Sequence, residues 1–153
     1  MEEIRLVTDE EAAQEIYTTR YADILILTAE NKILLQYRPI FWRSYPDKIV
    51  LFGGHIESGE TPLEAAIREI QEETGGLIKT PDLVSVATIS EAWTMHTELV
   101  HLYFWHDKKG TIRGCYEAES LLFETAAEAM AHAKLMPYAK WALEECVRKR
   151  LIG

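Results

Sequence analysis

Three glutamates in the middle of the chain have the spacing expected of a metal site. Glu69, Glu72 and Glu73 stand at positions i, i+3 and i+4, which places their side chains on one face of an α-helix. Like charges this close repel one another and raise each other's pKa. A hard divalent cation relieves the repulsion, and carboxylate oxygens suit Mg²⁺, for which Mn²⁺ can substitute. The spacing therefore predicts a helix face that holds a hard divalent cation.

Local sequence specifies the helix that must carry these carboxylates. Thr61, Pro62 and Glu64 predict a capping box, with Thr61 as the N-cap, Pro62 at the first helical position and Glu64 bonding back to the cap. Gly75 and Gly76 predict the end of the helix. An apolar stripe beside the carboxylates is expected to pack on the core: Leu63, Ala66, Ile67 and Ile70.

The same stretch resembles the signature of a known enzyme family. The Nudix hydrolases carry the pattern G-x5-E-x7-R-E-U-x-E-E-x-G-U, where U is apolar. This chain matches it with Gly54, Glu60, Arg68-Glu69-Ile70, Glu72-Glu73 and Gly75. The pattern has an aliphatic residue where this chain has Gly76, and Leu77 follows. A solvated acidic helix face is the alternative interpretation, but it does not explain the glycines, the arginine or Glu60.

The resemblance implies both a fold and an activity. The fold would be α+β, an α/β/α sandwich with a mixed sheet and a loop-helix-loop catalytic motif. The activity would be metal-dependent hydrolysis of the pyrophosphate linkage in a nucleoside diphosphate joined to another group. The chain most resembles the MutT-type enzymes, which act on nucleoside triphosphates. ADP-sugars and dinucleoside polyphosphates remain alternative substrates.

The resemblance also implies roles for individual residues. Glu72 and Glu73 match the metal ligands of the family, and Glu69 matches a ligand that also orients or deprotonates the attacking water. Glu60 and Arg68 match supporting positions of the catalytic motif, with Arg68 paired to a carboxylate such as Glu60. A surface salt bridge between Arg68 and Glu64 is the plainer alternative.

Further site residues are expected outside the helix. The carbonyl of Gly53 is a candidate metal ligand, because glycine lets the backbone approach an ion closely. One more carboxylate is expected from a distant loop, and Glu117 is preferred over Glu119 and Glu98. Substrate contacts are expected from a backbone glycine and from two aromatic rings in predicted loops: Gly54, Trp42 and Trp93.

Two other functions fit the sequence less well than hydrolysis does. The isopentenyl diphosphate isomerases share the fold, but they need a catalytic cysteine and metal-binding histidines, and neither Cys115 nor Cys146 stands in a matching context. A nucleotide-sensing domain would bind a ligand without cleaving it. Such domains typically lose motif carboxylates, and all of them are present here.

Composition agrees with one globular enzyme domain over residues 1–153, with homodimerisation left open. Hydrophobic residues make up 48% of the chain, enough for a sizeable core. A formal net charge of −9 argues against nucleic acid as a partner. The partner that the resemblance implies is a small nucleotide. The acidic N-terminal residues do not resemble a signal peptide, and no apolar run has the roughly 18 residues of a membrane span. The two cysteines are expected to be free thiols, which indicates the cytoplasm.

The remaining elements follow from hydrophobic patterning and turn residues. Strands are predicted at 21–28, 32–37, 48–52, 83–90, 97–106, 111–116 and 119–123. Helices are predicted at 8–16, 125–133 and 137–151, the last with Trp141, Leu143, Val147 and Leu151 on its buried side.

Overall fold

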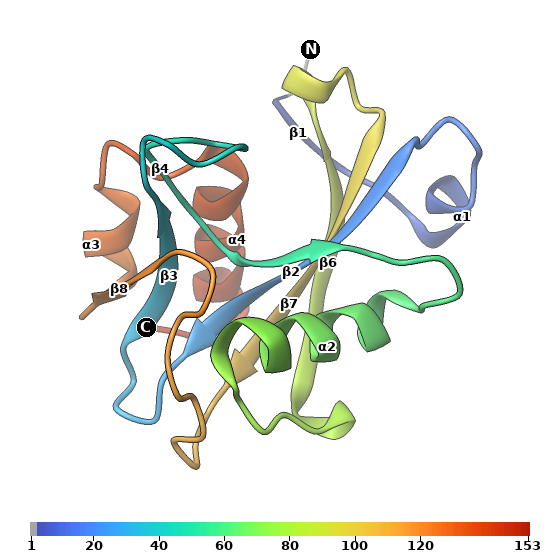
Figure 1. The fold of residues 1–153 in the computed structure, drawn as a ribbon. Coiled ribbons are helices and arrows are strands. Elements are labelled where there is room, and N and C mark those ends of the chain that lie inside the picture. The colour runs from blue at the N-terminus through green and yellow to red at the C-terminus, as the bar shows by residue number, and fades with distance from the viewer. Residues whose placement is uncertain (1–2) are drawn as a thin grey trace.

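The sheet of this protein lies between two layers of helix, as a computed structural model that describes residues 3–153 shows (Figure 1). Helix α2 (Pro62–Thr74) packs on one face, and α3 (Ala126–Met130) and α4 (Pro137–Arg148) pack on the other. Strand β2 (Thr19–Leu27) runs parallel to β7 (Glu98–His106) and antiparallel to its other neighbours. The predicted α+β class, with a mixed sheet in an α/β/α sandwich, is confirmed.

Eight strands form this sheet within the described residues, in the order β1-β6-β7-β2-β3-β4, with β5 on β2 and β8 on β3. The other strands are β1 Ile4–Leu6, β3 Ile33–Arg38, β4 Lys48–Val50, β5 Phe52–His55, β6 Leu83–Glu91 and β8 Glu119–Phe123. The short helices are α1 Asp9–Ala12, η1 Thr80–Asp82 and η2 Ala92–Thr94. None of the helices between residues 3 and 153 is long and apolar enough to cross a bilayer.

Two strands, β5 and β3, pair with different parts of the same edge of β2, and the sheet splits between them. Residues 21–24 of β2 pair with β5, whereas Ile26 and Leu27 pair with β3. The chain passes from β4, which pairs with β3, to β5 at the buried residue Leu51. Strands β3 and β5 therefore diverge from a common neighbour. Asp23, which lies opposite Gly53 in the β2–β5 register, stands next to the point where they separate.

The carboxylate helix forms as its sequence predicts. The Thr61 side chain accepts a hydrogen bond from the Glu64 backbone N–H at 3.1 Å, and the Glu64 carboxylate accepts one from the Thr61 N–H at 2.9 Å. Gly75 ends the helix in the left-handed conformation, with φ 70°. Ala66 and Ile70 are fully buried against even-numbered residues of β2. The helix is therefore anchored at both ends and along one side.

The one departure from the family pattern has a packing explanation. A Cβ atom at Gly76 would lie 2.7 Å from Cη2 of Trp105, a buried ring on β7. The indole of Trp105 thus fills the space that an aliphatic side chain after the helix would need. Leu77 is exposed and does not replace that side chain.

The predicted strand at 111–116 is wrong. Backbone N–H groups of this segment bond to the end of α2 instead: Arg113 and Gly114 donate to the carbonyl of Thr74, and Tyr116 donates to that of Glu73. The last carbonyls of a helix have no partner within it, so they compete for the donors that a strand would use. The segment becomes an irregular loop held against the helix.

Smaller corrections concern element boundaries. The single strand predicted at 48–52 is two strands that meet at Leu51, and the first helix is shorter than the predicted 8–16. Strand β1 was not predicted. On α4, Val147 is exposed rather than buried, and the buried side is formed by Tyr138, Ala139, Ala142, Leu143 and Cys146.

Candidate active site

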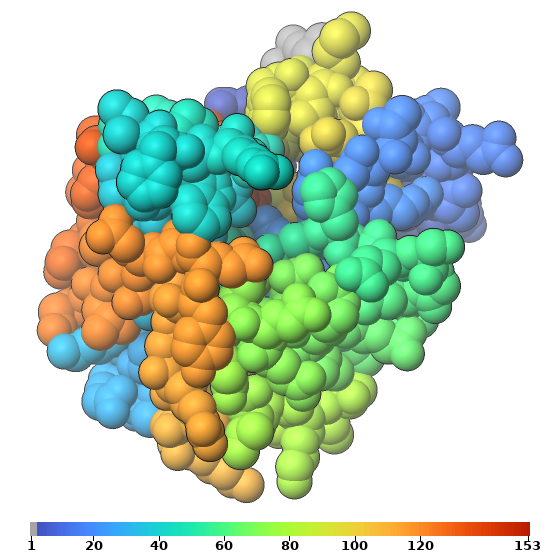
Figure 2. All heavy atoms as spheres, in the orientation of Figure 1, coloured from blue at the N-terminus to red at the C-terminus, as the bar shows by residue number. Residues whose placement is uncertain are grey.

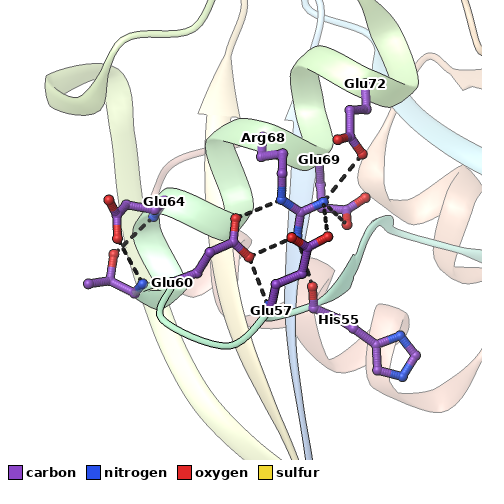
Figure 3. Close-up of polar contacts among 8 residues, drawn as sticks. His55, Glu57, Glu60, Glu64, Arg68, Glu69 and Glu72 are labelled. Atoms are coloured by element: carbon purple, nitrogen blue, oxygen red, sulfur yellow. Dashed lines mark hydrogen bonds and ion pairs between the residues drawn. The ribbon is translucent and has the colours of Figure 1, made fainter.

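Arg68 lies at the centre of a group of carboxylates on α2 and the loop before it (Figure 3). Its Nε donates to one oxygen of Glu60 at 2.6 Å, and its Nη2 donates to the other at 2.9 Å. The predicted ion pair between Arg68 and Glu60 is therefore present, and it is bidentate. Glu60 also accepts from the Glu57 N–H at 2.8 Å. The guanidinium lowers the pKa of Glu60 to about 2. The loop is thereby tied to the helix.

The other donors of Arg68 bind the helix carboxylates and the end of β5. Its Nη1 lies 2.9 Å from Glu69 and 3.3 Å from Glu72, and its Nη2 donates to the carbonyl of His55 at 3.0 Å. The alternative salt bridge with Glu64 is wrong, because the Glu64 carboxylate caps the helix at Thr61. Arg68 therefore orients two of the predicted metal ligands.

Glu73 is fully buried and has no ion-pair partner among the described residues. One of its oxygens accepts the Gly53 N–H at 2.9 Å, and the other is 3.4 Å from Nε2 of the buried Gln36. Burial raises the pKa of Glu73 to about 10. Burial also raises the pKa of Glu69, with Arg68 acting in the opposite direction. Both carboxylates need a proton or a cation to be stable in this environment.

The glycine pair at the end of β5 separates two acidic side chains. A Cβ at Gly54 would lie 2.5 Å from Oε1 of Glu69, and a Cβ at Gly53 would lie 2.2 Å from Oδ1 of Asp23. Only backbone fits between these carboxylates. Glu69 comes from the α2 side of the sheet, whereas Asp23 points to the α4 side.

The loop held against α2 brings a further carboxylate to the site. Glu117 follows the backbone contact between Tyr116 and Glu73, and its charge raises the pKa of both Glu69 and Glu73. Glu119 lies on β8 opposite Tyr37, outside the pocket described below. Glu98 lines that pocket from β7. The structure thus brings Glu117, the preferred residue, to the helix carboxylates.

The donor chemistry of these residues fits a hard divalent cation. Glu69, Glu72, Glu73 and Glu117 offer carboxylate oxygens, which suit Mg²⁺ or Mn²⁺. Among residues 3–153, however, no three Asp, Glu, His or Cys side chains converge as a complete metal cage. Arg68 lies between Glu60, Glu69 and Glu72 instead, and Glu72 is half exposed. The predicted ligand set, including the Gly53 carbonyl, stays a prediction.

A pocket of about 760 Å³ joins α2 to the opening in the sheet, a size typical of ligand sites. Figure 2 shows this face hollowed between the cyan segment near residues 40–47 and the yellow segment near 92–97. The pocket is lined by most of the predicted site residues: Trp42, Gly53, Gly54, Arg68, Glu69, Glu72, Trp93 and Glu117. Glu60 and Glu73 are not among the residues that line it.

Sequence reasoning missed four residues of this region: Asp23, Gln36, Glu57 and Tyr138. Asp23, Glu57 and Tyr138 line the pocket, and Gln36 contacts Glu73. Asp23 and Gln36 lie within apolar strand sequences, where a single polar residue was the only available signal. Burial raises the pKa of Asp23 to about 7.

Arg68→Lys is expected to lower the activity of the site roughly tenfold, because residues that orient metal ligands typically contribute 10- to 100-fold. Lysine keeps the charge but cannot bond to both oxygens of Glu60 while it reaches Glu69. The measurement is the rate of nucleotide hydrolysis with saturating Mg²⁺. Arg113→Lys, an exposed Arg-to-Lys change outside the pocket, is the matched control. Equal rates in both variants would contradict an orienting role for Arg68.

Known proteins with similar sequences or folds place this chain in the family that its motif resembles. A family model described as NUDIX domain matches residues 18–149. The m7GpppN-mRNA hydrolase NUDT17 of Xenopus laevis is 44% identical over 52 residues, which are 34% of this chain and 18% of that protein. The CTP pyrophosphohydrolase of Escherichia coli is 29% identical over 117 residues, 70% of this chain and 76% of that one. A mutT/nudix family protein from Listeria innocua has the same fold, with TM-score 0.70 and 18% identity over 88% of this chain and 95% of its own.

Proposed function

Because the chain belongs to the Nudix family, we propose that it is a pyrophosphohydrolase that cleaves the phosphoric anhydride of a nucleoside diphosphate joined to another group. We propose a nucleoside triphosphate as the substrate class. We further propose that the whole chain is one Nudix domain, and that it works in the cytoplasm, where its two free cysteines would stay reduced.

The observation that carries the proposal is that one pocket is lined by two kinds of group. The motif carboxylates Glu69 and Glu72, the glycine pair of β5, and the aromatic side chains of Trp42 and Trp93 all line it. A nucleotide likewise combines phosphates, which a carboxylate-bound cation would neutralise, with a flat ring, which aromatic side chains would contact. Glu69 lies within hydrogen-bond distance of Arg68, so its orientation is fixed.

The chain's own residues have defined tasks in this reaction. A water oxygen forms a bond to phosphorus, the bridging P–O bond breaks, and its electron pair leaves with the departing phosphate. Glu69 accepts the proton of that water in our proposal, while Arg68 holds its carboxylate in place. Glu72, Glu73 and Glu117 would hold the divalent cation together with Glu69. Bound there, the cation would neutralise phosphoryl oxygens that seven pocket carboxylates would otherwise repel.

The comparisons support a nucleoside triphosphate without deciding among substrates. One relative, which this chain matches over 70% of its own length and 76% of that protein's, acts, by its name, on CTP. The matched parts of the first relatives are only 18%, 17% and 35% of their own lengths, so their activities carry little weight for this chain.

A substrate panel tests the proposal directly. The full chain is incubated with Mg²⁺ and, in separate reactions, with the ribo- and deoxyribonucleoside triphosphates, ADP-ribose and a dinucleoside tetraphosphate. Chromatography of the products distinguishes a monophosphate plus pyrophosphate from a diphosphate plus phosphate, and so identifies the bond that breaks. We expect turnover of at least one triphosphate, dependent on the metal. Tight binding without turnover would favour a sensor, and turnover confined to ADP-ribose or the dinucleotide would overturn the substrate class.

A further inference from the structure

The pocket has an arm that the motif residues do not explain. We call it the far arm and define it by five side chains on the α4 side of the sheet: Asp23, Tyr45, Glu91, Trp93 and Tyr138. Its floor comes from β2, the end of β6 and the start of α4. The backbone of the glycine pair separates it from Glu69. The far arm therefore lies across the glycine pair from the motif carboxylate Glu69.

Aromatic rings form the walls of the far arm. The rings of Tyr45 and Trp93 meet edge to face, with centroids 5.4 Å apart and an interplanar angle of 81°. They come from the two segments that border the hollow in Figure 2. Trp42 lines the same pocket. Flat, amphipathic rings in this arrangement suit a planar ligand group such as a nucleobase.

The polar groups of the far arm are mainly hydrogen-bond acceptors. Asp23 and Glu91 are carboxylates, and Glu91 is only 7% exposed. Trp93 donates its indole N–H to Glu91. Asp23 accepts from the Tyr138 hydroxyl, which in turn accepts the Leu51 N–H at 3.2 Å. A carboxylate has about four acceptor positions, so Asp23 keeps acceptor capacity toward the pocket.

Among the described residues, Arg38 is the arginine whose charge acts on Asp23, and its Nε and Nη1 already have hydrogen-bond partners. Arg38 donates from Nε to Gln36 at 3.2 Å and from Nη1 to the Ser44 hydroxyl at 2.7 Å. It also lies 5.5 Å from the ring centroid of Tyr45. An anionic group of a ligand would be repelled here by the carboxylates of Asp23 and Glu91. A ligand group with N–H donors would instead find hydrogen-bond acceptors.

Resting on the proposed function, we propose that the far arm binds the nucleobase and that Asp23 accepts a hydrogen bond from an exocyclic amino group of that base. The site would then prefer adenine, cytosine or guanine over hypoxanthine or uracil. Uracil has a carbonyl oxygen where cytosine has an amino group, and hypoxanthine has one where adenine has an amino group; such a carbonyl facing Asp23 would place two acceptors opposite each other. Where guanine has its amino group, hypoxanthine has only a C–H, so Asp23 would lose its donor there. Asp23 is thus assigned as a residue that determines substrate specificity.

Matched nucleotide pairs test this assignment on the full chain with Mg²⁺. CMP and UMP differ by an amino group in place of a carbonyl, and IMP serves as the amino-free reference for AMP and GMP. Binding is measured by calorimetry at about pH 8.5, above the pKa of Asp23 of about 7, so that its side chain is a charged acceptor. We expect the amino member of at least one pair to bind roughly tenfold more tightly, as for a hydrogen bond to a charged group. In Asp23→Asn this preference should fall to about twofold or less, because an amide can also donate to a carbonyl.

Asp82→Asn, an exposed change on η1, is the control and should keep the full preference. The wild-type comparison needs no variant, so equal affinity within every pair overturns the inference even if Asp23→Asn folds poorly. An unchanged preference in folded Asp23→Asn overturns it as well. Monophosphate binding does not require hydrolysis, which separates the two proposals. If amino bases bind more tightly but no substrate is hydrolysed, the proposed hydrolase activity is wrong and the contact between Asp23 and the base is supported. If substrates are hydrolysed but amino bases bind no more tightly, the hydrolase activity is supported and the contact is wrong.

Discussion

Glu73→Gln is expected to lower the rate of hydrolysis roughly 1000-fold, about 4 kcal/mol of activation free energy, the size of effect that losing a metal-binding carboxylate produces. Glu73 is fully buried, and its carboxylate joins the Gly53 N–H to the Gln36 amide. Glutamine has the same shape and still offers one oxygen to Gly53. It cannot carry the negative charge that a divalent cation requires. The measurement is kcat for the best substrate of the panel at saturating Mg²⁺.

The same variant should remain folded. With its pKa raised to about 10 by burial, Glu73 without a cation is protonated near neutral pH, so an amide changes little in that form. We expect the unfolding free energy in urea, without added metal, to change by about 1 kcal/mol or less. Glu144→Gln, on the exposed side of α4, is the matched control. Near-normal activity of Glu73→Gln would remove Glu73 from the proposed ligand set.

Metal binding supplies a readout that does not depend on turnover. A ligand that binds only the folded state at 100 times its Kd stabilises a protein by roughly 2.7 kcal/mol. Wild-type protein should therefore melt at a higher temperature as Mg²⁺ or Mn²⁺ is added. Glu73→Gln should lose most of that shift. A shift of equal size in both proteins would show that the cation binds elsewhere.

Much of the catalytic helix could be predicted because its signals are local. The capping box of Thr61 and Glu64 and the left-handed Gly75 lie within or next to the helix that they delimit, so their spacing alone is informative. The pair between Arg68 and Glu60 joins groups eight residues apart and follows from the motif. Most strands were found for a similar reason, since apolar runs bounded by turn residues mark them.

What the sequence did not predict depends on contacts between distant segments. The 111–116 segment has strand-like residues, but its N–H groups bond to carbonyls at the end of α2. The space after that helix is filled by Trp105, 29 positions away from Gly76 along the printed sequence. Asp23 looks like one polar residue in a buried strand until the β2–β5 register places it against Gly53. Tertiary packing overrides local preference at each of these positions.

Gly54→Ala is expected to lower the rate of hydrolysis roughly 100-fold, the cost of a 1 Å misplacement of a catalytic group, while the fold stays intact. The new Cβ would lie 2.5 Å from Oε1 and 2.8 Å from Cδ of Glu69, so that carboxylate must move. Its three nearest atoms all belong to the end of one side chain, which can rotate away. The expected loss of unfolding free energy is therefore about 1 kcal/mol.

Gly53→Ala should instead lower the stability of the fold, and comparing the two variants tests which atoms lie against each glycine. Its Cβ would lie 2.3 Å from the Ala22 carbonyl oxygen and 2.7 Å from the Asp23 Cα, which are backbone atoms of the neighbouring strand, and φ is 153°. Backbone cannot move aside as a carboxylate can, so we expect a loss of about 3 kcal/mol or more in urea unfolding. If Gly54→Ala unfolded as readily as Gly53→Ala, its effect on rate would reflect a damaged strand. If Gly54→Ala were fully active, the position of the Glu69 carboxylate would not limit the reaction, and its assignment as the group that accepts the proton would fail.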